Sequence, residues 1–401
     1  MRNEIDFNMP KKKGRKPKLY LVLDCETATL PFIKNWECTA KQRQQLSIAK
    51  PLIYDLGWQI IDAKGNIYSR HSFLIQETFF VPQVFNTAYY AWKRPLYMER
   101  YDKGEIICKT WAEATAILEM DLERADISLA YNAMFDFKKA IPFTERYINA
   151  LYSPHYQEWE DKQRVSCQKI VAGYKYENPN EFDPHNFEFR DYKYPIADLW
   201  GLSCNRLINK DKYRINCIKE SMISASGLYF KTSAESTFRF LIKNNGFEEE
   251  HTALSDSQIE SEILVKILRK GKIDTGIEYF PFRELGYTTD YVTSQPPKKM
   301  TYDMVDNIIQ IMYEKLGEYD RQSSFASNLE TNLIRLELWL QNNHGKMHEE
   351  VFKDCKVSQL QKQLRRKMNY ATSLNSDGKA YDRCVREIRR FEEEIQMILD
   401  N

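Results

Sequence analysis

The chain has 401 residues, which is enough for two or three domains and a substantial hydrophobic core. Its hydrophobic content of 43% and charged content of 29% are typical of a soluble globular protein, and no stretch approaches the roughly 18 apolar residues of a membrane span. The net charge is only +1, so overall basicity does not indicate a nucleic-acid partner.

The N-terminal segment, residues 1–18, has no apolar h-region, so we expect a cytoplasmic protein rather than a secreted one. Within it, KKKGRKPK at 11–18 carries six positive charges in eight positions. This composition predicts a basic flexible arm. A tether that grips phosphates, or a nuclear-targeting signal in a eukaryotic source, are the alternatives. Eight cysteines without any C-x-x-C pair favour reduced thiols over a disulfide framework or a zinc site.

The first predicted element is a strand at 19–23, LYLVL, whose continuous apolar run indicates burial on both faces. Two further strands follow at 53–61 and 66–75, and the turn DAKGN between them predicts a hairpin. The later pattern predicts a helix near 110–124, a strand at 127–132, a helix from about 136, a strand at 194–200, and helices at 233–245 and 255–270. This order predicts an α/β fold with a mixed five-stranded sheet that opens with antiparallel strands and adds parallel ones through helical crossovers.

Two regions do not fit a minimal domain. Residues 145–193 are rich in aromatic and charged residues with poor periodicity, and we interpret them as an insertion. The stretch 285–300 contains a Pro-Pro pair among polar residues and marks a domain boundary. Beyond it, 300–401 is predicted to be an all-helical domain that ends in a helical hairpin around the turn NSDG.

The last hairpin carries ten lysines or arginines between 356 and 390. A solvated outer face is the simplest interpretation of these charges. The alternatives are an arm that binds the nucleic-acid backbone, a module that docks a protein partner, and a seam that pairs with a second copy of the chain.

Two acids follow the first strand in the stretch LYLVLDCETATL. Because side chains alternate along a strand, Asp24 and Glu26 project from the same face, about 7 Å apart along the chain. Two partly buried carboxylates at this distance repel each other. A divalent metal ion would offset that repulsion.

Two later stretches supply further candidates. In ISLAYNAMFDFKKA, Asp136 lies where a helix begins, a position where an aspartate is most often a helix cap. In HTALSDSQIESEIL, Ser255 and Gln258 predict a capping box, and Asp256 shares a helix face with isoleucines at i+3, i+7 and i+11. Asp256 is therefore expected to face inward. The helix dipole stabilises such an acid by less than about 1 kcal/mol, whereas a metal would explain its burial.

These three stretches resemble the three exonuclease motifs of the DEDDh family of 3′→5′ exonucleases, which includes the proofreading subunit of bacterial replicative polymerases, RNase T and oligoribonuclease. DCETATL resembles the first motif, YNAMFD the second, and HTALSDSQIESEIL the third. The resemblance covers roughly 18–270 and implies a ribonuclease-H-like fold for a domain at 19–285. Two features depart from the family: the span between the second and third motifs is long, and the tail after 300 matches nothing in the family.

The resemblance implies that Asp24, Glu26, Asp136 and Asp256 hold two Mg²⁺ or Mn²⁺ ions about 4 Å apart. It makes His251 the general base, since an imidazole with an ordinary pKa near 6.5 can accept a proton at neutral pH. A tyrosine subclass places Tyr four residues before the last Asp, and this position is Thr252 here. Residues expected to meet the terminal nucleotide are Thr27, Ala28, Leu30, Asn132 and Phe135, of which Phe135 is equally well a core residue.

Three functional hypotheses follow. The first is hydrolysis of single-stranded DNA from a free 3′ end with release of 5′-mononucleotides, ranked ahead because the basic arm and tail would keep a long strand bound. The second is the same chemistry on RNA, as in RNase T and oligoribonuclease, where the site must accept the 2′-hydroxyl. The third is an interaction protein whose helical tail docks a polymerase or another partner and whose exonuclease domain is a passenger.

Overall fold

The structure is a computed structural model that describes residues 16–35, 39–172, 193–274, 285–374 and 378–400. The chain forms two compact units, the first comprising 1–206 with 246–279 and the second 207–245 with 280–401. Residues 207–245, which the sequence analysis places in the exonuclease domain, therefore group with the C-terminal helices. Most of the predicted basic arm lies outside the described residues.

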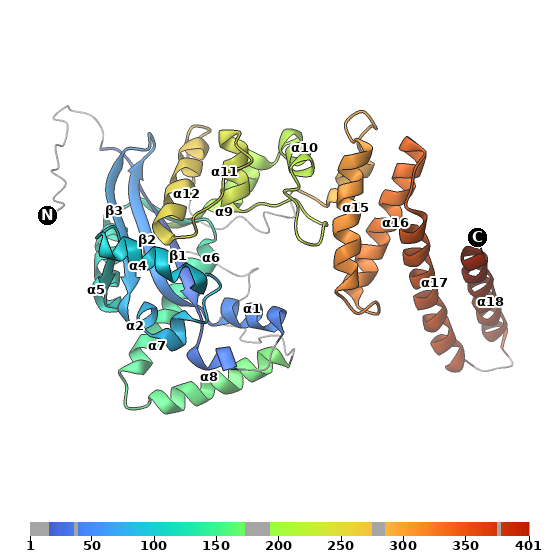
Figure 1. Ribbon diagram of the computed structural model, residues 1–401, viewed down its shortest axis with the longest axis horizontal. Coiled ribbons are helices and arrows are strands. Elements are labelled where there is room, and N and C mark those ends of the chain that lie inside the picture. Colours follow the sequence, from blue (N-terminus) through green and yellow to red (C-terminus); the bar gives the residue numbers. More distant parts are fainter. Residues whose placement is uncertain (1–15, 36–38, 173–192, 275–284, 375–377, 401) are drawn as a thin grey trace. The chain divides into compact units, whose positions relative to one another are not determined.

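The first unit contains a six-stranded mixed sheet in the order β4-β3-β2-β1-β5-β6, of which Figure 1 labels the neighbouring strands β1, β2 and β3. Strands β1, β2 and β3 are antiparallel, whereas β4 runs parallel to β3, β5 to β1 and β6 to β5. The strands are β1 (Leu19–Ala28), β2 (Leu52–Asp62), β3 (Ile67–Ile75), β4 (Ile107–Lys109), β5 (Ile127–Ala130) and β6 (Ile196–Asp198). The predicted mixed sheet is confirmed, but the expected number of five strands is wrong. The added edge strand, β4, has three residues, too few to show a two-residue period.

Helices cover both faces of this sheet. Strand β2 is buried at every residue, as its near-continuous apolar sequence requires. On one face, α12 (Ala253–Leu268) packs against β1, β2 and β3. On the other, α5 (Trp111–Arg124) contacts β1, β3 and β4, and the indole N–H of Trp58 donates a hydrogen bond of 3.0 Å to Asp121 of α5. Both helices confirm predicted elements.

The close approach of α12 to β2 depends on Gly57. In the antiparallel register Gly57 lies opposite Asp24 of β1, so the two residues share a sheet face. A Cβ atom at Gly57 would lie 2.2 Å from the backbone nitrogen of Leu254 in the first turn of α12. Glycine at this position therefore lets the start of α12 lie directly over the strand that carries the first pair of acids.

The remaining elements of the first unit are mostly short helices after the strands. They are η1 (Pro31–Asn35), α1 (Ala40–Ala49), α2 (Gln76–Phe79), α3 (Pro82–Phe85), η2 (Ala91–Lys93), α4 (Arg94–Asp102), α6 (Ala133–Phe135), η3 (Asp136–Ala140), α7 (Ile141–Leu151), α8 (Tyr156–Val171), α9 (Leu199–Ser203) and, at the boundary of the units, η5 (Cys204–Ile208). The predicted insertion includes the end of α7 and all of α8, which packs against α1. Its residues 173–192 lie outside the described part of the chain.

The second unit is helical, as predicted for the C-terminal region. Its helices are α10 (Asp211–Lys219), α11 (Ala234–Ile242), α14 (Thr288–Thr293), α15 (Tyr302–Gly317), α16 (Ser324–His344), α17 (Glu349–Thr372) and α18 (Lys379–Asp400). A buried ion pair of 2.7 Å between Glu330 and Lys362 joins α16 to α17, and Lys367 pairs with Glu387 between α17 and α18. The predicted final hairpin is confirmed. Among the described helices, none is both long and apolar enough to cross a membrane.

The packing at Gly57 predicts the effect of one substitution. Gly57→Ala should lower the free energy of unfolding by about 1–3 kcal/mol, because the added methyl group forces α12 away from β2. Gly317→Ala is the matched control, since a Cβ atom there meets no atom within 4 Å. Urea denaturation of both variants measures the difference, and an unchanged midpoint for Gly57→Ala would contradict the close approach.

Candidate active site

The first two acids belong to strand β1 itself. The strand extends to Ala28, five residues beyond the predicted segment, so Asp24 and Glu26 both lie within it. They pair with Gly57 and Asp55 of β2 and are half-buried on the face covered by α12. The inference that both carboxylates share one face is confirmed.

Asp136 reaches the same edge of the sheet from the neighbouring parallel strand. β5 ends at Ala130, the short helix α6 follows, and Asp136 begins the π-helical turn η3. Because β1 and β5 are parallel neighbours, the segments that follow them emerge at the same edge. The thiol of Cys25 donates a hydrogen bond of 2.9 Å to the buried Asp136 carboxylate. Asp136 is therefore an inward-facing residue rather than a helix cap.

Asp256 and His251 come from the start of α12. The helix begins at Ala253, two residues before the predicted start, and the expected capping box of Ser255 and Gln258 is wrong. Instead, the backbone N–H of Ala253 donates a hydrogen bond of 2.9 Å to Asp55 of β2, so a side chain from a distant strand caps the helix. The inward orientation expected for Asp256 is confirmed by its burial.

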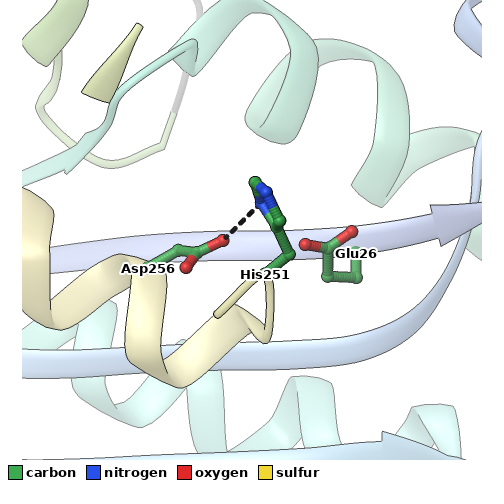
Figure 2. Close-up of side chains that lie close together, drawn as sticks. All are labelled: Glu26, His251 and Asp256. Atoms are coloured by element: carbon green, nitrogen blue, oxygen red, sulfur yellow. Dashed lines mark ion pairs between the residues drawn. The ribbon is translucent and has the colours of Figure 1, made fainter. Parts of the chain in front are cut away.

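Three of the predicted residues form a compact group. Glu26, His251 and Asp256 each offer one ligand atom, and these atoms all lie within 4.8 Å of one another. Figure 2 shows Glu26 on its strand, Asp256 on the first turn of α12 and His251 on the loop before it. The Nδ1 atom of His251 lies 3.8 Å from the Asp256 carboxylate and 3.7 Å from that of Glu249.

The electrostatics of the group are those of crowded acids. Burial raises the pKa of Asp24 well above its usual range, and the charges of Glu260, Asp136 and Asp256 raise it further. Burial also raises the pKa of both Asp136 and Asp256 to about 7. Removal from water disfavours each charged form, and neighbouring negative charges add to the effect. A divalent cation bound among these oxygens would reverse it.

The donor set fits a hard divalent cation. Carboxylate oxygens are the ligands that Mg²⁺ and Mn²⁺ prefer. One buried oxygen, Oε2 of Glu260, has no hydrogen-bond partner among the described residues. Such oxygens are rare inside proteins and are candidates for binding an ion.

The loop that carries His251 is held by residues from η2 and α4. The ring of Tyr90 stacks on that of His251 with centroids 4.5 Å apart and 15° between the planes. Lys93 donates a hydrogen bond to the backbone carbonyl of Glu250, and Arg100 pairs with the Glu250 carboxylate. The loop needs this support because His251 has a positive φ of 52°, an uncommon conformation for a residue other than glycine.

The residues predicted to contact the substrate differ in the solvent exposure of their side chains. Thr27 is partly exposed and Asn132 is exposed, so their side chains are accessible. Ala28 and Leu30 are only 1% and 0% exposed, and a ligand would meet them through the backbone alone. Phe135 is partly buried and packs against the hydrophobic core.

The sequence analysis missed several residues at this site. Glu260 could have been found, because it follows Asp256 by one helical turn and therefore lies on the same face of α12. The supports Asp55, Tyr90 and Arg100 are distant in the chain from their partners, and no local pattern identifies them.

Comparison of the chain with protein-family models, with curated proteins and with solved structures finds no match. The resemblance to the DEDDh exonucleases therefore rests on the three motifs and on the geometry of the residues that they contribute.

The raised pKa values predict an unusual pH dependence of stability in metal-free buffer. A carboxyl with a pKa of 3.8 when unfolded and about 7 when folded binds an extra proton in the folded state between these values. The free energy of unfolding should therefore fall as the pH rises through this range, by more than about 1 kcal/mol between pH 5 and 8.

Urea denaturation with a chelator present measures this loss. Asp136→Asn should show a smaller loss because it removes one of the acids, and Mn²⁺ should restore the stability of the unsubstituted protein at pH 8. Equal stability of the metal-free protein at pH 5 and pH 8 would contradict the repulsion.

Proposed function

We propose that this chain is a metal-dependent 3′→5′ exonuclease of the DEDDh kind that hydrolyses single-stranded DNA and releases 5′-mononucleotides. The observation that carries the proposal is the group formed by Glu26, His251 and Asp256. The first and third motifs lie more than 220 residues apart in the chain. Nevertheless, the ligand atoms of Glu26 from the first motif and of His251 and Asp256 from the third all lie within 4.8 Å of one another. The charges of Glu26, Asp136 and Asp256 each raise the pKa of Asp24, which links the remaining two acids to this group.

The topology of the sheet supports the proposal. Without the short edge strand, the order is β3-β2-β1-β5-β6 with only β2 antiparallel to the others, and this order is consistent with the ribonuclease-H-like sheet that the resemblance implies. In that arrangement the first motif lies on the central strand β1 and the second follows its parallel neighbour β5. The acids are therefore brought to one edge by the strand order itself.

The chain's own residues have distinct parts in the proposed reaction. Asp24, Glu26, Asp136 and Asp256 would hold the cations, which supply charge neutralisation at the phosphodiester and a lower pKa for the attacking water. His251 accepts the proton of that water at Nδ1, the ring nitrogen that faces Asp256. Tyr90 keeps the imidazole ring in this orientation by stacking on it.

An exposed aromatic pair beside the histidine favours an unpaired strand as the substrate. Tyr89 is 86% exposed and Trp92 is 72% exposed, and they flank Tyr90, which stacks on His251. Lys93 lies 5.3 Å from the Trp92 ring and adds a positive charge. Exposed aromatic rings are suited to bind unstacked bases, because every base has a face that can stack.

The metal ligands are tested by measuring mononucleotide release from a single-stranded DNA oligomer with Mg²⁺. Asp24→Ala and Asp136→Ala should each lower the rate by on the order of 1000-fold or more, since a bound metal supplies several kcal/mol of transition-state stabilisation. Glu119→Ala, an exposed acid on α5, is the matched control and should keep full activity. Retained turnover in both site variants would overturn the proposal.

The role of His251 is tested through the pH profile. His251→Ala should slow turnover by about 100-fold or more and leave metal and DNA binding intact. Between pH 6 and 8 the rate of the unsubstituted protein should rise more steeply than that of His251→Ala, because a general base acts only in its deprotonated form. An unchanged rate across this range would remove the histidine from the role of base.

The identity of the sugar is tested with matched DNA and RNA oligomers that have free or blocked 3′ ends. Faster release from DNA, and none from blocked ends, is the expected result. Faster release from RNA would keep the chemistry and change the substrate to RNA.

A further inference from the structure

A further acid lies on the site's own helix. Glu260 follows Asp256 by one turn of α12 and is 3% exposed. Carboxylates are almost never this deeply buried without a partner, because removal from water costs several kcal/mol for each charge. The position of Glu260 therefore needs an explanation that packing alone does not supply.

Only one of the two carboxylate oxygens of Glu260 accepts a hydrogen bond from the described residues. The backbone N–H of Tyr131, at the end of β5, donates a hydrogen bond to it and orients the group. The other oxygen, Oε2, is buried and no donor among the described residues reaches it. One oxygen atom with free lone pairs is thus held in place at the edge where β1 and β5 end.

The charged neighbours of this oxygen are the proposed metal ligands. Asp136 and Asp256 are the charges with the largest effects on Glu260. In turn, Glu260 has the largest effect of any charge on Asp24. The charge of Glu260 therefore interacts with acids from all three motifs, and an additional negative charge there is compatible with folding when a cation is bound.

We propose that Glu260 is a fifth carboxylate ligand of the divalent metal site and binds the cation through Oε2 beside Asp24 and Asp136. This inference rests on the proposed metal-dependent function. It gives α12 two ligands, Asp256 and Glu260, spaced by one turn and directed to the same edge of the sheet. The site then has five carboxylates where the motifs alone supply four.

The test is calorimetric titration of the full-length, metal-free protein with Mn²⁺. Glu260→Gln preserves the shape and removes the charge, and Glu260→Asp keeps the charge but withdraws the oxygen by one methylene. Both variants should bind Mn²⁺ at least about 10-fold more weakly than the unsubstituted protein. Glu262→Gln, an exposed acid two residues further along α12, should not change the affinity.

The outcomes separate this inference from the proposed function. If Glu260→Asp retains full affinity while Glu260→Gln loses it, Glu260 acts through its charge and not as a ligand, and the inference is overturned. Unchanged affinity in both variants overturns it as well. If Asp24→Asn weakens Mn²⁺ binding and the Glu260 variants do not, the fifth ligand fails while the metal site stands. Absence of saturable Mn²⁺ binding in the unsubstituted protein would overturn both.

Urea denaturation of the metal-free variants controls for misfolding. Glu260→Gln should be at least as stable as the unsubstituted protein above pH 7, because it removes a repelling charge from a buried compartment. A metal-free Glu260→Gln protein that is less stable would mean that the carboxylate has a structural role, which would overturn its assignment as a ligand.

Discussion

Mutual repulsion among carboxylates at the end of β1 constrains the first unit more than any other interaction. Asp24, Asp136 and Asp256 come from three separate segments, and the charges of Asp136 and Asp256 raise the pKa of Asp24 beyond the effect of its burial. They stay together because other contacts hold the segments that carry them. β1 lies inside the sheet, and α12 is fixed to β2 through Gly57 and through the bond from Ala253 to Asp55. The hydrophobic core thus holds a group that is unfavourable in isolation, as is common where activity needs a strained site.

The histidine is held independently of the acids. Its loop is stabilised from the side by Tyr90, Lys93 and Arg100. Tyr90 immediately precedes η2, Lys93 follows Tyr90 by three residues at the end of η2, and Arg100 follows Lys93 by seven residues in α4. One short segment of the chain therefore supplies all three contacts to the loop. The same segment presents Tyr89 and Trp92 to solvent. Recognition of an unpaired base and orientation of the imidazole would therefore depend on a single short element.

The sequence predicted those features of the structure that depend on residues close together in the chain. Alternation and apolar runs located five strands within a few residues. The spacing of Asp24 and Glu26 predicted that they share one face of the strand, and the position of Asp256 on its helix predicted that it faces inward. The sequence was uninformative where a partner lies far away in the chain. The helix start was misplaced because Asp55, nearly 200 residues earlier, caps α12 in place of Ser255. The grouping of residues 207–245 with the C-terminal helices likewise depends on long-range contacts that leave no pattern within the segment.

The left-handed backbone at His251 limits how this site can diverge. Histidine, asparagine and aspartate tolerate such a conformation better than bulky or branched residues do. The next residue, Thr252, has an extended backbone with φ −128° and is buried, so a tyrosine ring at that position has no room. A tyrosine in place of Thr252 would therefore require a rebuilt loop, so under the proposed function a single substitution at this position cannot exchange the histidine for a tyrosine base.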